Sequence, residues 1–464
     1  MIETPVLERV LGEALRHGGD FAEVFAEDRV NSSAVLDDGR IEELASGRDR
    51  GAGIRVVSGE TTGFAHTADL SEQGLLRAAA AASAVARGSG PGPGTAVTPD
   101  RLGDPAGRPV SGDGPGTVAK ADTLELLRRA DEAARATGGA VTQVQAGYGG
   151  SRRRVLVANS EGVLAGDEQV RTRFSVSCVA EGDAGLQTGF ETAARTVGFE
   201  MFEDVSVEEL AELAARRALA KLSARPAPSG ELPLVLAGGS GGILFHEACG
   251  HGLEADHIVK DASVYVGQVG RQVASPLVTL VDDGGVGTEW GTFAVDDEGR
   301  PAQRNVLIDK GILTDYLWDY LRARKEGRRS SGNGRRQSYQ CLPMVRMTNT
   351  FLLPGEDDAD EIIAQTPRGV YVARLGGGQV NTTTGDFVFG TTEAYLIEDG
   401  HLTEPLRDAN LIGNGPEILT RVDAVAGDFA MTPGTCGKDG QSVPVGCGQA
   451  TLRLTGVTIG GTAQ

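Results

Sequence analysis

The stretch GGSGGILFHEACGHGLEADH, residues 238–257, decides how the rest of this chain is interpreted. It contains three of the six histidines of the 464-residue sequence, and His246 is followed at once by Glu247. The apolar run at residues 232–237 precedes it with the pattern of a buried strand, and glycines fill its first positions. We therefore expect a strand that passes through a glycine loop into a helix, with the chemistry of the protein at that junction.

The spacing of two histidines in this stretch poses a geometric problem. His246 and His251 are five positions apart, one more than in the His-Glu-x-x-His pattern of zinc peptidases. At about 100° per residue, a step of five rotates the second imidazole by about 140°, whereas a step of four rotates it by about 40°. The two rings can share a metal ion only if a π-bulge widens the turn or the helix ends there, and Gly250 and Gly252 would permit either change. The alternative is a glycine-rich helix start with two core histidines.

A catalytic zinc site usually has three protein ligands and one open position. Four residues are candidates for the third ligand: Glu254, His257, Cys249 and Cys436. His257 follows His251 by six residues, the interval found in metzincins, whereas Cys249 lies between the two imidazoles and is expected to point elsewhere. Lys438 is near Cys436 in the sequence, and a close cation lowers the pKa of a thiol and favours the metal-binding thiolate. The residues alone do not decide between His257 and Cys436 as the third ligand.

The composition is that of a strongly acidic chain. Sixty-four acidic residues against 44 basic ones give a formal net charge of −20, which disfavours binding to nucleic acid. No apolar run approaches the roughly twenty residues of a membrane helix, and the first residues, MIETP, lack the pattern of a signal peptide. Five scattered cysteines do not indicate a disulfide framework. We expect a cytoplasmic protein that binds neither nucleic acid nor a membrane.

The first half of the chain alternates between two kinds of pattern. Helical spacing recurs in four stretches: 6–17, 72–87, 119–137 and 207–222. Short alternating segments at 21–67 and 141–199 indicate antiparallel meanders, with pairs such as Ser46-Gly47 interpreted as turns between strands. Residues 88–116, dense in Gly and Pro, indicate a surface excursion or a connector.

The segment RPAPSG at residues 225–230 is the clearest boundary in the sequence. Beyond it we expect one helix at the histidine motif, another near residues 360–365, and otherwise short strands and glycine loops. The predicted fold class is α+β. Residues 1–228 form an N-terminal mixed α/β region of antiparallel meanders and helices, which the segment at 88–116 could divide into two subdomains. Residues 229–464 form a β-rich catalytic domain around the His-Glu-x-x-x-His helix.

Five stretches carry a resemblance to a known family. They read HEACGHGLEAD, GNGRR, MVRMTNT, GGGQVN and CGKDGQSVPVG, at residues 246–256, 332–336, 344–350, 376–381 and 436–446. Together they resemble the TldD/PmbA family of zinc metallopeptidases, and specifically its TldD-like catalytic subunit. The resemblance covers nearly the whole chain and is strongest from about residue 232 onward. The combination of stretches is specific, although no single stretch is.

The resemblance implies a zinc site with assigned roles. It assigns His246, His251 and Cys436 as the metal ligands and Glu247 as the general base, and it leaves His257 beside the site or on the surface. The implied reaction is zinc-assisted hydrolysis of peptide bonds in unfolded polypeptides or small peptides.

Several further residues stay outside the predicted site. We expect ordinary ion pairs and turn contacts for four of them: Arg335, Arg336, Arg346 and Asn381. Cys447 is expected to be a packed thiol and is the weaker alternative to Cys436 as a ligand. The glycines at 376–378 allow close backbone approach, which suits a peptide that adds as an extra strand.

The resemblance also implies a partner, a TldE/PmbA-like subunit that lacks the metal motif and forms a heterodimer with this chain; a homodimer is the alternative. A second hypothesis keeps the zinc site but assigns it to the maturation of one peptide precursor or natural product. A third is a non-catalytic assembly or binding subunit with structural histidines. Metal analysis separates the third hypothesis from the other two.

Overall fold

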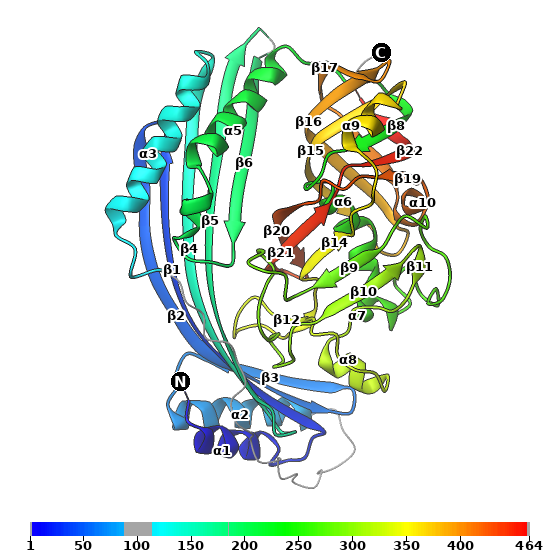
Figure 1. Cartoon of the computed structure of the whole chain (residues 1–464). Coiled ribbons are helices and arrows are strands. Elements are labelled where there is room, and N and C mark those ends of the chain that lie inside the picture. The colour runs from blue at the N-terminus through cyan, green and yellow to red at the C-terminus, as the bar shows by residue number, and fades with distance from the viewer. Residues whose placement is uncertain (1, 88–113, 184, 462–464) are drawn as a thin grey trace.

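The computed structural model describes residues 2–87, 114–183 and 185–461. An antiparallel sheet of long strands forms the N-terminal part and curves around one side of the C-terminal part (Figure 1). Its strands run in the order β3 (Thr61–Thr67), β2 (Arg40–Ser58), β1 (Phe21–Asp37), β4 (Val141–Asn159), β5 (Leu164–Gly182) and β6 (Gly185–Arg195). Most of the predicted connector at 88–116 lies outside the described residues.

Helices cover both ends of this sheet. α1 (Thr4–Ala14) and α2 (Glu72–Arg87) pack together at the end near the N-terminus, while α3 (Lys120–Thr137) and α5 (Val207–Leu222) pack together at the other (Figure 1). The short α4 (Met201–Asp204) precedes α5. Apolar residues recur every three or four positions in these helices, so each helix buries one face in a core shared with the strands.

The strands of this sheet are longer than the sequence predicts. Ser46-Gly47, interpreted as a turn, lies inside β2, and residues 40–50 of that strand are all exposed. An exposed strand needs no alternating apolar face. The small and charged residues of this part of β2 therefore show no strand pattern in the sequence. β1 and β4 pair antiparallel over residues 23–37 and 145–159, which joins both predicted meanders in one sheet.

The C-terminal part contains a sheet that closes on itself. β15 (Arg368–Val380) pairs with β16 (Asp386–Glu398), and the two strands are also connected through a series of other strands. That series is β8 (Gly230–Leu236), β22 (Leu452–Gly460) and β18 (Asn410–Asn414). Three strands extend the sheet outside the ring: β17 (His401–Arg407), β7 (Arg225–Pro226) and β19 (Val422–Val425). β8 is the apolar strand predicted before the histidine motif.

A second sheet lies beside the ring. Its order is β11 (Ile312–Leu313), β10 (Arg304–Asp309), β9 (Leu280–Asp283), β14 (Asn349–Leu352), β21 (Gln441–Gln449) and β20 (Ala430–Lys438). A separate pair consists of β12 (Gly334–Arg335) and β13 (Met344–Val345). Three short helices complete this part: α8 (Tyr320–Lys325), α9 (Ala359–Ala364) and α10 (Gly415–Thr420). The sequence predicts α9 but misses α8 and α10, which have only six residues each. The predicted α+β class, with a β-rich C-terminal part, is confirmed.

A buried ionic network joins the two parts of the chain. The guanidinium of Arg55 in β2 contacts the carboxylates of Glu23, at 2.9 Å, and Glu298, at 2.8 Å. Arg336 contacts the other oxygen of Glu23 at 2.5 Å. We call these four residues the Arg55 network; each is at most 2% exposed. Burial at this contact fixes the sheet against the C-terminal part.

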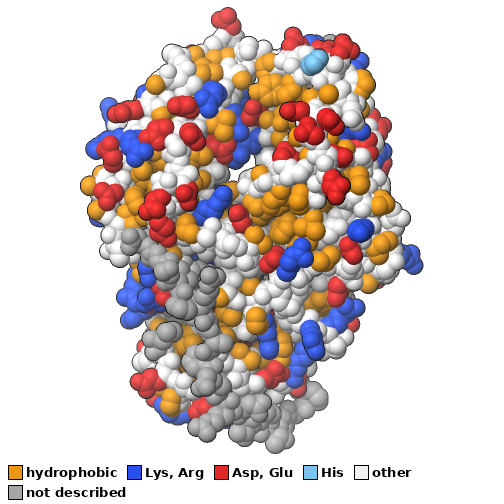
Figure 2. All heavy atoms as spheres, in the orientation of Figure 1, with side chains coloured by type: hydrophobic (Ala, Val, Ile, Leu, Met, Phe, Trp, Pro, Cys, Tyr) orange, Lys and Arg blue, Asp and Glu red, His pale blue; other side chains and the backbone are white. Residues whose placement is uncertain are grey.

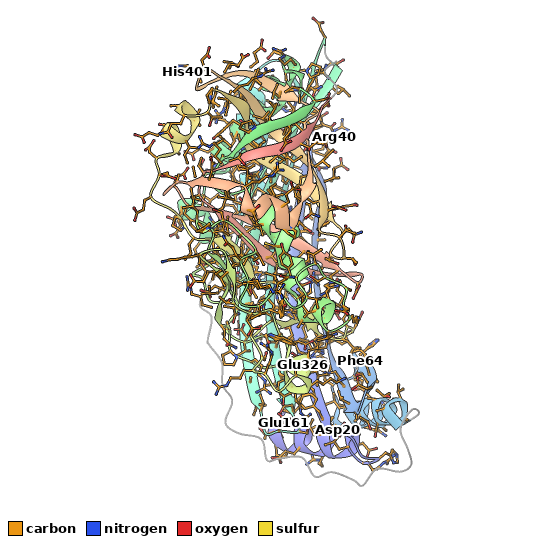
Figure 3. The ribbon with its side chains drawn as sticks, turned by 90° about the vertical axis from the view of Figure 1, so that its right-hand side faces the viewer. Asp20, Arg40, Phe64, Glu161, Glu326 and His401 are labelled. Atoms are coloured by element: carbon orange, nitrogen blue, oxygen red, sulfur yellow. The ribbon has the colours of Figure 1, made fainter. Side chains whose placement is uncertain are left out.

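The molecule is elongated. Figure 3 places His401 near one end and Asp20 and Glu161 near the other, with the C-terminal part along the sheet. Every helix within the described ranges is too short or too polar to cross a lipid bilayer.

Candidate metal centre

The histidine motif begins where β8 ends, as predicted. A glycine loop leads into α6 (Gly242–Phe245), a π-helical turn η1 (His246–Gly250), a 3-10 turn η2 (His251–Leu253) and α7 (Ala255–Ile258). The backbone N–H of His251 donates to the carbonyl oxygen of His246, the bond that defines a π-helical turn. The predicted widening is therefore confirmed, and it brings the two imidazole rings to a centroid separation of 5.1 Å.

The glycines beside His251 act differently from the prediction. Gly250 has φ −54° and ψ −50°, an ordinary helical conformation that any residue adopts. A Cβ atom at Gly250 would lie 2.1 Å from Sδ of Met347. Close packing against β14 and its neighbours, and not backbone freedom, therefore requires glycine at this position.

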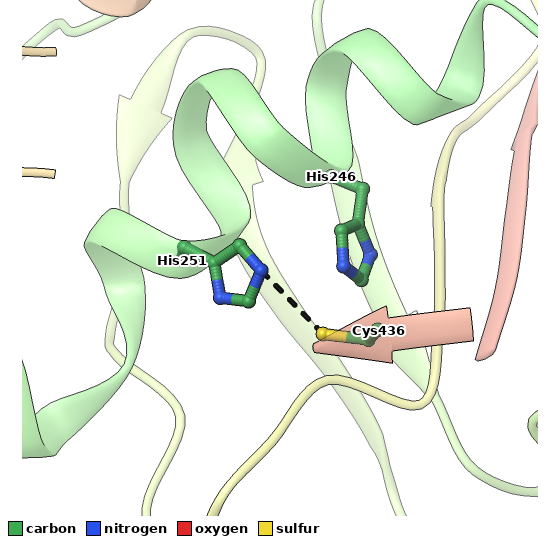
Figure 4. Close-up of side chains that lie close together, drawn as sticks. All are labelled: His246, His251 and Cys436. Carbon is green, nitrogen blue, oxygen red and sulfur yellow. Dashed lines mark hydrogen bonds between the residues drawn. The ribbon is translucent and has the colours of Figure 1, made fainter. Parts of the chain in front are cut away.

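Cys436 reaches the two imidazoles from β20. Its Sγ lies 3.4 Å from Nε2 of His251, and one ligand atom from each of His246, His251 and Cys436 lies within 4.8 Å of the others (Figure 4). The three residues are 2%, 7% and 2% exposed, so they form a buried cluster. The pairing of β20 with β21, in which Cys436 is opposite Val443, holds the thiol in place.

The cluster has the properties of a metal site. Neither ring nitrogen of His246 makes a hydrogen bond to any residue in the described part of the chain, although both are buried. Buried polar atoms without partners are rare in folded proteins because each costs free energy. A zinc ion takes two imidazole nitrogens and a thiolate sulfur as ligands. The residues present therefore fit this ion.

Electrostatics couple the three groups. Burial opposes ionisation of Cys436, but the neighbouring His246 and His251 outweigh it and hold the pKa of the thiol well below its ordinary value. Burial also opposes the charged form of His251, but Glu254 and Cys436 raise the pKa of that imidazole to about 10. The site thus favours a thiolate beside positive charge. The largest favourable effects on the thiol come from the two imidazoles, and Lys438, the cation expected beside it, pairs with Glu254 and Asp256.

Glu254 contacts the ring nitrogen of His251 that faces away from Cys436, and Lys438 contacts Glu254. Oε2 of Glu254 lies 2.9 Å from Nδ1 of His251, which leaves Nε2 directed at Cys436. The Lys438 ammonium donates to Glu254 at 2.8 Å and to Asp256 at 2.7 Å. A carboxylate on the far nitrogen of a histidine fixes its tautomer and raises its basicity as a ligand. Glu254, predicted as a possible third ligand, therefore orients one.

The other candidate ligands lie elsewhere. Sγ of Cys249 donates to the carbonyl of Phe245 at 2.9 Å, and burial raises the pKa of its thiol to about 12. His257 is half-buried and groups with Glu254 and Asp256, not with His246. Cys447 is the exception: it packs with Cys436 in a small apolar cluster, lines the same cleft as His246 and interacts electrostatically with that imidazole. It lies outside the group of three residues whose ligand atoms are all within 4.8 Å of one another.

Glu247 faces an open cleft. Its Oε2 lies 3.8 Å from Nε2 of His251, and its side chain is 23% exposed, more than the three buried cluster residues. Together with His246 it lines a cleft of about 580 Å³ between the sheet and the C-terminal part. The glycines at 376–378 and Trp290 form other parts of its wall. A substrate in this cleft would meet both the carboxylate and an imidazole of the cluster.

Comparisons with known proteins cover most of the chain. Residues 22–86, 113–222 and 229–461 match domain 1, the central domain and the C-terminal domain of PmbA/TldA metallopeptidases. The chain belongs to the PmbA/TldD metallopeptidase family. It is 40% identical to the metalloprotease TldD homolog of Haemophilus influenzae over 96% of this chain and 93% of that protein. It is 38% identical to the homolog of Buchnera aphidicola subsp. Acyrthosiphon pisum, with the same coverage.

Solved structures with lower sequence identity share the fold. TldE from Thermococcus kodakarensis superposes with a TM-score of 0.77 at 21% identity, over 98% of this chain and 99% of that one. A Thermotoga maritima protein described as a modulator of a DNA gyrase superposes with a TM-score of 0.81 at 19% identity, with the same coverage. A relative from Saccharolobus solfataricus, 28% identical over 62% of this chain and 64% of that one, is called a zinc metalloprotease TldD homolog.

Two of the four motif residues, Arg336 and Asn381, make the contacts expected of them, whereas Arg335 and Arg346 donate to backbone carbonyl oxygens and form no ion pair within the described residues. Arg336 forms an ion pair with Glu23, and the Asn381 side chain accepts two backbone N–H groups within a turn. Arg346 donates to the carbonyl oxygens of Cys436 and Gln441 and so braces the strand that carries the thiol. The sequence gives no sign of this support, because Arg346 and Cys436 are 90 positions apart.

Proposed function

We propose that this chain hydrolyses peptide bonds with a zinc ion held by His246, His251 and Cys436. The observation that carries the proposal is the buried convergence of two imidazoles and one thiol, with both nitrogens of His246 left without partners. Family membership, and the name of one relative as a zinc metalloprotease, support the choice of zinc. Nitrogen and thiolate ligands also suit zinc better than a hard cation such as magnesium.

The residues of the site divide the chemistry between them. Zinc, when bound, would polarise the scissile carbonyl and lower the pKa of water at the open position. Glu247 accepts the proton of the attacking water and then delivers it to the leaving amine. Its partial exposure in the cleft gives it access to both. Glu254 holds His251 in the orientation that directs Nε2 at the cluster.

The cleft suits an extended peptide. β15 pairs with β8 only at residues 370–372, so the glycines at 376–378 have no β8 partner in the described structure. An extended chain can add to such an edge through backbone hydrogen bonds, and these bonds do not depend on the side chains of the peptide. We infer that the substrates are unfolded polypeptides or small peptides, because a folded protein presents no free strand to a cleft of this size.

We further propose that the chain works in a dimer and in the cytoplasm. The shared fold of TldE supports a heterodimer with a TldE-like subunit, and a homodimer is the alternative. Five free cysteines in the described ranges suit a reducing compartment.

We also treat residue 228 as the boundary between an N-terminal α+β unit and a C-terminal catalytic unit. Light scattering and activity measurements, with and without a TldE-like protein, test the dimer.

Substitution of the general base tests the proposed function. Glu247→Gln should retain about one zinc per chain but lose about 10²- to 10⁴-fold in kcat, because it removes the proton acceptor without removing a ligand. Glu42→Gln, an exposed position of β2, is the control for loss of one acidic charge and should cleave peptides like the wild type. Unchanged kcat in Glu247→Gln would reject the role of Glu247.

A further inference from the structure

A second cavity adjoins the cleft and is lined by arginines. It has a volume of about 220 Å³ and lies between the N-terminal sheet and the strands β20 and β21. Trp290 and Thr435 line both this cavity and the metal cleft, so the two spaces share a wall, and Thr435 directly precedes Cys436. Five guanidinium groups face the cavity: those of Arg29, Arg153, Arg171, Arg335 and Arg336. Figure 2 shows a gap between the N-terminal and C-terminal parts of the molecule, with Lys or Arg side chains beside it.

Three of these arginines are matched by carboxylates. Arg153 contacts Glu27 at 2.7 Å and Asp297 at 3.0 Å, and Arg29 contacts Glu27 at 2.6 Å. Arg336 belongs to the Arg55 network and contacts Glu23. These ion pairs account for the acidic groups around the cavity except Asp296, which accepts hydrogen bonds from three backbone N–H groups. Burial, and then Glu298, raise the pKa of Asp296 well above its ordinary value.

The remaining two arginines form no direct ion pair within the described residues, although Asp167 interacts electrostatically with Arg171 and Asp297 with Arg335. Within the described residues, no carboxylate lies within 4.0 Å of the guanidinium of Arg171 or Arg335, and these side chains belong to residues only 6% and 4% exposed. Arg171 donates to the carbonyl oxygens of Trp290 and Thr292 and to Gln169. Arg335 donates to the carbonyl oxygens of Met347 and Pro444. A guanidinium carries five N–H donors, so both groups retain donors for a ligand.

Burial and neighbouring guanidinium groups disfavour the charged forms of both arginines. Burial, and then Arg335 and Arg153, lower the pKa of Arg171 to about 9. Burial, together with Arg346, lowers the pKa of Arg335 to about 10 despite Asp297. A bound anion would relieve both effects, because buried charges are stable only when they are paired.

We propose that this cavity binds a carboxylate of the peptide substrate, held by Arg171 and Arg335 while the adjoining chain lies in the metal cleft. The proposal rests on the proposed peptidase function. A carboxylate matches the planar, two-pronged donor geometry of a guanidinium, and a volume of 220 Å³ holds such a group with a few waters. The protein as a whole carries a net charge of −20, so a local cationic cavity would attract an acidic group that the rest of the surface repels. The carboxylate is either the C-terminus of the peptide or an Asp or Glu side chain.

Binding to the zinc-loaded Glu247→Gln protein tests this proposal without catalysis. Isothermal titration would compare two pairs of unstructured peptides: a free C-terminus against its amide, and an internal Asp against Asn. At least one acidic peptide should bind about 10- to 100-fold more tightly than its neutral counterpart, as expected for charge-assisted hydrogen bonds. The pair that shows the difference identifies the source of the carboxylate. Equal affinities within both pairs would overturn the proposal, and this comparison needs no change to the cavity.

Variants of the cavity make the assignment to residues. Arg171→Gln in the same background should remove the difference and leave the affinity for the neutral peptides unchanged, whereas Arg171→Lys should restore part of it. Arg154→Gln is the matched control, because Arg154 lies on the same sheet but pairs with Glu168 outside the cavity. A difference that persists in Arg171→Gln would place the carboxylate elsewhere and overturn the proposal. Selective binding without cleavage by the wild type would instead reject the peptidase function alone.

Discussion

Two buried clusters of ionisable groups in this protein differ in how their members are paired. In the Arg55 network, Arg55 contacts both Glu23 and Glu298, and Glu23 also contacts Arg336. In the metal centre, both nitrogens of His246 lack hydrogen-bond partners among the described residues. Both clusters are almost fully buried. Nε of Arg55 and Nε of Arg336 also lack a hydrogen bond to any described residue, but each of these guanidinium groups contacts a carboxylate, whereas the His246 ring makes no such bond through either nitrogen. The difference separates groups that hold the fold together from groups arranged for a ligand.

Loss of a metal ligand should give the largest effect on activity. We expect Cys436→Ala to reduce zinc content from about one to nearly none per chain and to lower kcat/KM by about 10³-fold or more, since no thiolate completes the site. Metal analysis and a peptide-cleavage assay measure both values. Cys341→Ala, a half-buried cysteine outside the centre, is the control. Full zinc content in Cys436→Ala would remove Cys436 from the proposed ligand set.

Breaking the Arg55 network should instead affect stability. Arg55→Met leaves two buried carboxylates without their shared cation, which costs about 3–5 kcal/mol in the free energy of unfolding. Zinc binding should be retained in the protein that remains folded. Denaturant unfolding with zinc analysis tests both statements. Arg48→Met, an exposed partner of Asp28 on the same strand, should cost about 1 kcal/mol or less.

A smaller effect on the metal centre is expected from the carboxylate that pairs with His251. Glu254→Gln removes the carboxylate behind His251 but keeps a hydrogen-bond acceptor, so zinc affinity should fall by about 10- to 100-fold. Competition with a chelator measures this affinity. Glu231→Gln, an exposed glutamate on β8, should bind zinc like the wild type. An unchanged affinity in Glu254→Gln would mean that this carboxylate serves packing alone.

The smallest predicted effect is on pH dependence. Burial, and then Asp319 and Glu23, outweigh Arg55 and raise the pKa of Glu298 from its ordinary 4.5 to about 7. Between these values the folded protein binds more protons at Glu298 than the unfolded chain does, so its contribution to stability is full below about pH 4.5 and lost as pH rises to about 7. Relative to Glu298→Gln, the Tm of the wild type should fall by about 1–3 °C between pH 5 and pH 8. Parallel Tm profiles would contradict the raised pKa.

The histidine motif was accessible from the sequence, because its geometry is local. A spacing of five positions requires a widened turn if both rings are to meet, and the structure contains a π-helical turn there. Cys436 is 185 positions from His251, and the residues alone left it level with His257. Resemblance to a family favoured Cys436, and the structure brings its sulfur to the imidazoles.

Contacts between distant segments were beyond prediction. Glu254 was recognised as a candidate, but its role behind His251 depends on side-chain direction, which spacing does not give. The exposed half of β2 has no apolar face, so the sequence pattern predicts a turn inside what is one continuous strand. The arginine cavity assembles side chains from β1, β4, β5 and β12, so no local pattern marks it.

X-ray absorption at the zinc edge tests the central claim most directly. The purified protein should contain about one zinc per chain with two nitrogen ligands and one sulfur ligand from the protein, and the sulfur contribution should disappear in Cys436→Ser. Zinc bound without sulfur in the wild type, or the absence of bound metal after incubation with zinc, would contradict a site formed by His246, His251 and Cys436.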